Sequence, residues 1–178
     1  MSTIKTNAIQ TVAGKPILNS TGSILQVVQT VKTDTFSMTA ATFTDVTGLS
    51  VTITPSSASS KILIMAQGIG GYQSYQLRFR LLRGSTPLAL GDANGVKTQG
   101  TLSLSSYSGS TTNDAYQLVP FVITNLDSPS TTSPTTYKIQ IATYASFAAY
   151  INRSHNWQNT TEYDGTMSSS IAAMEVSA

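Results

Sequence analysis

The chain has 178 residues, of which 40% are hydrophobic and only 10% are charged, and its formal net charge is +2. Soluble domains usually carry roughly 25% charged residues, so Ser and Thr fill most polar positions here. This composition excludes a disordered charged tail, and the scattered Lys and Arg residues argue against nucleic-acid binding. Because the chain has no Cys, it has neither a disulfide framework nor a thiolate metal site.

Membrane insertion and secretion by a signal peptide are not expected from the sequence. No stretch approaches the roughly 18 to 20 continuous apolar residues that span a bilayer. The N-terminus, Met-Ser-Thr-Ile-Lys, also lacks the apolar core of a signal peptide. We therefore expect a protein that is made in a cytosol and leaves it, if at all, as part of something larger.

Residues 1–23 contain spaced apolar residues without a lasting helix or strand period. They suit an extended peptide that docks on another surface, and the residues expected to dock are Ile4, Ile9, Val12, Ile17 and Leu18. The alternative is a terminus that stays loose or folds back on its own domain.

From residue 24 onward the pattern is that of short strands separated by Gly, Pro, Asp, Asn and Ser clusters. Segment 24–31 is apolar on both faces, as expected of a strand covered on each side, whereas 49–54, 75–81 and 136–144 alternate with period two. Further strands are expected at 42–46, 61–67, 88–90, 101–104, 116–126, 148–152 and 170–176, with a turn at Gly48. Roughly eight to ten strands and no long helix predict an all-β, antiparallel sandwich or jelly roll over residues 24–178.

The sequence gives little support for catalysis or metal binding. His155 is the only histidine, and the nearest carboxylates, Glu162 and Asp164, lack a recognised ligand spacing. There is no Gly-x-Ser-x-Gly elbow, and the carboxylates lie mostly in expected turns. We therefore expect no enzyme and no cofactor, although paired-carboxylate glycosidase chemistry stays open because distant residues can meet in space.

One polar loop near the C-terminus is rich in aromatic and amide side chains. It contains Asn152, Arg153, His155, Trp157 and Tyr163. Aromatic faces beside planar amides suit contact with sugars or with another protein. The alternative, that Trp157 packs at a strand end or a subunit interface, has equal support.

Ordered blocks across most of residues 25–178 resemble a C-terminal domain common in fibre, decoration and other virion proteins of marine and freshwater, cyanophage-like tailed phages. These blocks are residues 26–37, 43–64, 79–84, 126–129, 136–140, 150–154 and 171–176. Residues 2–11 look like the start of short fibre and decoration proteins of such phages.

The resemblance implies a structural protein of a virion, a homotrimer with a jelly-roll knob similar in outline to the tumour necrosis factor fold. It further implies an N-terminal arm docked on capsid or tail proteins and a knob exposed on the assembled particle. The chain has no repetitive shaft, which favours a short fibre or capsid-decoration subunit. A receptor-binding tail tip that recognises host surface polysaccharide is the alternative function.

Overall fold

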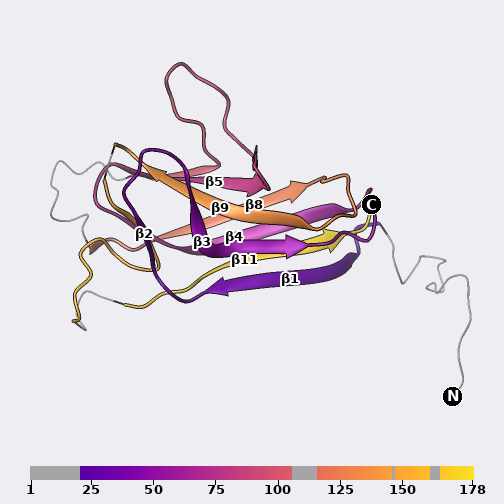
Figure 1. The fold of residues 1–178 in the computed structure, drawn as a ribbon, viewed down its shortest axis with the longest axis horizontal. Coiled ribbons are helices and arrows are strands. Elements are labelled where there is room, and N and C mark those ends of the chain that lie inside the picture. The colour runs from indigo at the N-terminus through magenta and orange to yellow at the C-terminus, as the bar shows by residue number, and fades with distance from the viewer. Residues whose placement is uncertain (1–20, 106–115, 146, 161–164) are drawn as a thin grey trace, which may run out of the picture.

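A computed structural model describes residues 21–105, 116–145, 147–160 and 165–178 of the chain (Figure 1). The five expected docking residues of the arm, Ile4 to Leu18, and Tyr163 of the aromatic loop lie outside these ranges. The described residues form antiparallel sheets and no helix longer than a single turn, so the predicted all-β sandwich is confirmed. None of these residues forms a helix able to cross a membrane.

The strands fall into two sheets. The first sheet contains β1 (Ile24–Lys32), β2 (Phe36–Met38), β4 (Lys61–Tyr72), β8 (Val119–Asp127), β10 (Ala149–Ile151) and β11 (Ser169–Val176). The second contains β3 (Thr44–Ile53), β5 (Gln76–Arg83), β6 (Thr86–Leu88), β7 (Leu102–Ser105) and β9 (Thr135–Thr143).

Four strands span the first sheet in the order β1, β11, β4, β8. Gly70 of β4 pairs with both Val119 of β8 and Ile151 of β10. A strand has only two edges, and β8 occupies one edge of β4 at Gly70. β10 therefore pairs with the other edge of β4, the edge that also pairs with β11, and lies end to end with β11. β2 pairs with β10 and so continues the line of β1.

The second sheet runs β3, β9, β5, and then β6 and β7, which pair with successive stretches of one edge of β5. The two strand orders, β1-β11-β4-β8 and β3-β9-β5-β7, are those of a double Greek key, which makes the sandwich jelly-roll-like. Figure 1 shows the strands of both sheets running along the long axis of the molecule.

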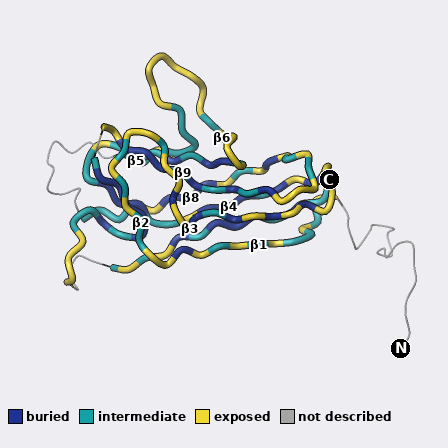
Figure 2. The backbone as a smooth tube through the Cα atoms, viewed as in Figure 1, coloured by how far each residue is buried: buried dark blue, intermediate teal, exposed yellow. Residues whose placement is uncertain are grey.

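The core lies between the inner faces of the two sheets (Figure 2). The alternation seen in the sequence at Leu77, Phe79 and Leu81 is confirmed, because all three side chains are fully buried. Phe79 of the second sheet meets Phe121 of the first with ring centroids 4.6 Å apart. Such aromatic pairs contribute roughly 0.5 to 1.5 kcal/mol beyond the area they bury.

The expected turn at Gly48 is wrong, because this residue lies inside β3. The register with β9 shifts between Asp45, opposite Gln140, and Ser50, opposite Lys138, so the extra residues form a bulge. Gly48 has φ +81°, a conformation that favours glycine. Because both a bulge and a turn can use a residue with positive φ, a glycine at this position does not distinguish between them. The sequence pattern also missed β2, which has only three residues.

Glu175 is a buried carboxylate held entirely by hydrogen bonds. Its Oε1 accepts from the Ser56 backbone N at 2.7 Å and from the Ser56 hydroxyl at 2.6 Å, and its Oε2 accepts from Gln26 Nε2 at 2.5 Å. Burial alone would raise the pKa of this carboxyl, but these bonds and one from Ser60 outweigh it and lower the pKa to about 2. The carboxylate thus ties β11 to β1 and to the loop after β3.

We predict that Glu175→Gln lowers the free energy of unfolding at pH 7 by about 2 to 3 kcal/mol, because the new amide group faces donors. The folded pKa is below the unfolded value of 4.5, so the contribution of the carboxylate is complete above pH 4.5 and is lost as the pH falls toward 2. Urea unfolding at pH 7 and pH 3 should therefore show a smaller difference between the two proteins at pH 3. Asp92→Asn, at an exposed carboxylate, is the control; an equal effect of both substitutions would contradict the assignment.

Candidate functional site

The outer face of the first sheet is apolar across all four strands. Along each strand, alternate residues point into the core and the rest point outward. The registers align one outward residue from each strand in a row that is apolar throughout and consists of Val27, Met174, Leu63 and Leu126. Val27 and Leu126, at the two ends of this row, are 56% and 52% exposed.

The neighbouring rows of this face are mixed but uncharged. One contains Gln29, Ala172, Met65 and Thr124, and the other contains Val31, Ser170, Gln67 and Val122. Among the outward residues of these four strands, all of them described, only Lys61 at the end of β4 is charged. We call this surface, from β1 to β8, the sheet face. Monomeric proteins rarely expose contiguous apolar patches beyond a few hundred Å².

The sandwich has two ends, and the aromatic loop lies at the end opposite to the chain termini. Ile24 pairs with Val176, and Gly22 N donates to the Ser177 carbonyl, so the described chain starts and ends at the same end of the sandwich. The described residues of the loops at 73–75, 144–145, 147–148, 152–160 and 165–168 lie at the opposite strand ends (Figure 1). The aromatic loop predicted from the sequence therefore belongs to the end far from the termini.

Asn152, one of the expected partner-binding residues, is fully buried and serves the fold. Its Nδ2 donates to the carbonyls of Lys32 at 3.0 Å and Asp34 at 2.9 Å, and its Oδ1 accepts from the Ser169 hydroxyl at 2.6 Å. Its φ of +65° is left-handed, a conformation that Asn tolerates better than most residues. Asn152 thus joins the ends of β1, β10 and β11 and is not available to a ligand.

Arg153 and His155 pack with aromatic rings beside this buried residue. The Arg153 guanidinium lies 4.1 Å from the ring centroid of Tyr150 and 5.0 Å from that of Trp157. His155 Nδ1 is 2.9 Å from the Tyr150 hydroxyl. Burial, and then the charge of Arg153, lower the pKa of His155, so its ring is neutral near pH 7. Arg153 is held in a cation–π stack that orients Trp157.

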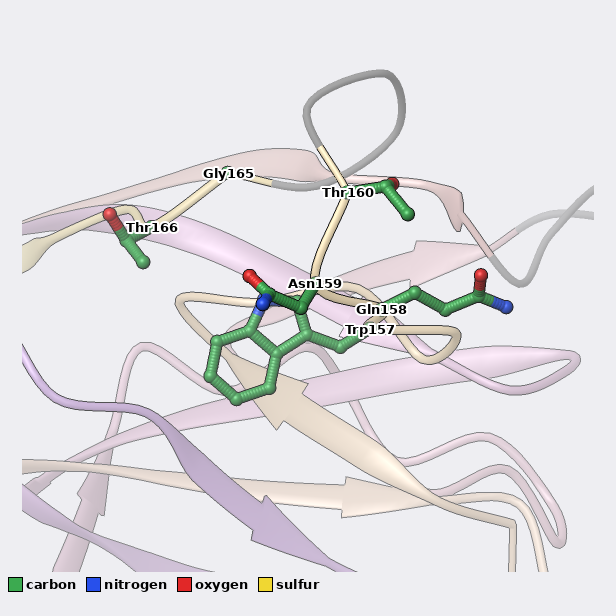
Figure 3. A pocket seen from close by; sticks show the side chains of 6 residues that line it. All are labelled: Trp157, Gln158, Asn159, Thr160, Gly165 and Thr166. Atoms are coloured by element: carbon green, nitrogen blue, oxygen red, sulfur yellow. The ribbon is translucent and has the colours of Figure 1, made fainter.

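A pocket of about 590 Å³ opens beside Trp157 (Figure 3). The lining residues that the structure describes carry no charge; they are Trp157, Gln158, Asn159, Thr160, Gly165 and Thr166. Glu162 and Asp164 of the same loop lie outside the described ranges. A cavity of this size falls in the range of small-ligand sites. The indole and the amide side chains of this loop were expected from the sequence, whereas Gln158 and Thr160, which also line the pocket, were not singled out.

The carboxylates of the described residues mostly have structural partners. Lys32 Nζ lies 2.8 Å from Asp34, Lys138 Nζ lies 2.6 Å from Asp45, and Arg83 Nη1 lies 2.8 Å from Asp127. Within the described ranges, no group of three His, Asp or Glu residues could hold a metal ion. The expected carboxylates Glu162 and Asp164 lie outside them.

The chain was compared with protein-family models and with curated proteins, and neither comparison finds a match. The functional assignment therefore depends on the geometry of the sheet face and of the loops at the far end.

We predict that Asn152→Ala lowers the free energy of unfolding by about 2 to 4 kcal/mol, because it leaves two carbonyls and the Ser169 hydroxyl without their partner. Asn152→Gly should be less harmful by about 1 kcal/mol, since Gly adopts a positive φ without steric cost. Trp157→Ala, at a ring 44% exposed, is the control and should cost well under 1 kcal/mol. Urea unfolding checks all three; equal stability of Asn152→Ala and Trp157→Ala would show that Asn152 has no such role.

Proposed function

We propose that the chain is a non-enzymatic structural protein of a tailed-phage virion, a homotrimeric short-fibre or capsid-decoration appendage. In this proposal the sheet face joins the copies, the N-terminal arm docks on capsid or tail proteins, and the β knob faces outward. The observation that supports it best is the largely apolar sheet face, on which Lys61 is the only charged outward residue. The phage assignment itself comes from the resemblance of the sequence blocks.

The size of the sheet face suits contact with other copies of the chain. Four strands about 4.8 Å apart, each about eight residues long at about 3.3 Å per residue, give a face of roughly 19 by 26 Å. That projection of about 490 Å², to which side-chain relief adds, is more than half of the ~800 Å² that each partner buries in a stable interface. Because Lys61 lies at one end, copies can approach without like charges meeting at the centre.

The positions of the two ends fit an appendage. The first described residues leave the sandwich beside the C-terminus, where Gly22 bonds to Ser177. An arm that continues from there would anchor this end on a particle and leave the opposite loops outward. The engaged carboxylates of the described residues support a structural role over an enzymatic one.

We predict that the protein sediments as an assembly of three times 18.8 kDa and that Met65→Glu converts it to a monomer. Met65 lies on the inner strand β4 and is 43% exposed, so a carboxylate there would be buried without a partner in the assembly. Val96→Glu is the matched control, because Val96 is fully exposed on the segment between β6 and β7. Sedimentation velocity gives the masses, and circular dichroism checks that both variants fold.

Two results would reject association through the sheet face. One is a wild-type protein that stays monomeric at micromolar concentration. The other is a Met65→Glu variant that keeps the mass of the wild type. A dimer in place of a trimer would keep the face as an interface but reject threefold symmetry.

The docking role of the arm has its own test. We predict that Ile9→Asp combined with Val12→Asp abolishes co-sedimentation with particles that lack the protein, because an extended docking peptide binds through its apolar side chains. The assembly mass should not change. The matched control is Thr6→Asp combined with Thr11→Asp, which adds the same charge at polar positions of the arm. Particle binding that survives the apolar substitutions would rule out this mode of anchoring.

A receptor-binding tail tip that recognises host surface polysaccharide is the second candidate function. It is favoured by the Trp157 pocket at the end far from the termini, whose described lining residues offer an indole, amides and hydroxyls. An indole face beside amide and hydroxyl groups offers a sugar ring both an apolar surface and hydrogen bonds.

A further inference from the structure

Three aromatic side chains gather on the loops that join β4 to β5 and β9 to β10. The ring centroid of Tyr75 lies 5.1 Å from that of Tyr144 and 5.3 Å from that of Phe147. The rings of Tyr144 and Phe147 are 6.4 Å apart and nearly parallel, at 19°. Tyr75 and Tyr144 are 49% and 52% exposed, so the cluster offers ring surface to solvent. We call these three residues the aromatic platform.

The backbone of the aromatic platform is held in an unfavourable conformation. Tyr75 has φ +63° and Ala145 has φ +53°, both in the left-handed region that non-glycine residues rarely adopt. Such residues cost of order 1 to 3 kcal/mol each and cluster at ligand-binding sites, where surrounding contacts hold them. Two of them beside three solvent-facing rings indicate a surface shaped for contact.

Hydrogen bonds fix the two loops to each other. Gln73 N donates to the Ala148 carbonyl at 2.9 Å, and Ala148 N donates to Gln73 Oε1 at 3.1 Å. The Thr143 hydroxyl lies 3.0 Å from the carbonyls of Ala40 and of Phe147. The rings are therefore positioned before any ligand arrives, which lowers the entropic cost of binding.

The size and charge of the aromatic platform indicate its ligand. Aromatic side chains bury about 150 to 250 Å² when fully covered, so three partly exposed rings offer at most a few hundred Å², well below the ~800 Å² per partner of a protein interface. The loop sequences 73–75 and 144–148 contain no acidic or basic residue. A small uncharged ligand with a flat apolar face fits both facts, and a pyranose ring has such a face.

We propose that the aromatic platform stacks against a pyranose ring of an uncharged polysaccharide, as a subsite separate from the Trp157 pocket. This inference rests on the second candidate function, glycan recognition at the end far from the termini. Both subsites lie on loops at the end of the sandwich far from the termini, so two sugars of one long polysaccharide could bind together and each subsite would need only weak affinity.

The test uses the full chain and cellohexaose, whose equatorial hydroxyls leave the ring faces apolar. Saturation-transfer NMR and calorimetry should show binding with a Kd in the millimolar range for the wild type. Tyr75→Asn combined with Tyr144→Ser should weaken binding at least tenfold; Asn tolerates the left-handed conformation, which preserves the loop. The conservative pair Tyr75→Phe with Tyr144→Phe keeps the rings and should bind within about threefold of the wild type, since stacking depends on the ring face.

The Trp157→Ala variant separates this inference from the function on which it rests. Weaker binding both in Trp157→Ala and in the double variant Tyr75→Asn with Tyr144→Ser supports two subsites. Weaker binding in Trp157→Ala alone overturns the aromatic platform and leaves glycan recognition in place. A wild-type protein that does not bind cellohexaose, or binds hexagalacturonate equally well, overturns the platform as a site for uncharged sugars. Unchanged binding in every variant overturns both ideas.

Discussion

The structure depends on one constraint: the first sheet has two apolar faces, and the sandwich covers only one of them. The second sheet does not share this property, because its outer face carries Arg78, Arg80 and Lys138, and the hydroxyls of Thr52 and Thr136 bond across it at 2.8 Å. This difference between the two sheets follows from the strand sequences, since most of the outward-pointing residues of β1, β4 and β8 are apolar. The partner proposed for the sheet face would cover the apolar side of the first sheet that the sandwich leaves open.

The strand order also places the chain termini at one end of the sandwich and the aromatic loops at the other. The pairing of β1 with β11 brings the two chain ends together, and the long β4 carries the chain from that end to the far loops. Assembly through the sheet face would leave both ends of the sandwich free, one for an arm and one for contact with the outside. Loops held on a rigid sandwich are the usual place for binding residues.

The fold was largely predictable because its signals are local, while the sites depend on distant contacts. Period two identified the inward face of β5, and 24–31 was correctly predicted to be a strand. The expectation that this strand is covered on each side is wrong for the described chain, because Val27 and Val31 are more than half exposed. Gly48 was misjudged because a bulge and a turn both need a positive φ. The burial of Asn152 depends on Lys32 and Ser169, and no pattern in the sequence joins them. Tyr75 and Tyr144 meet only because β5 and β9 are neighbours.

The small number of charges is consistent with an assembled protein. Asp34, Asp45 and Asp127 pair with cations of the same chain, and Glu175 is buried among hydroxyls and an amide. On the sheet face itself Lys61 is the only charged outward residue, so little charge there would repel other copies. In the proposed assembly, the specificity of association between copies would come from the shape of the sheet face. The row from Val27 to Leu126 supplies that shape, because the strand registers fix its four side chains relative to one another.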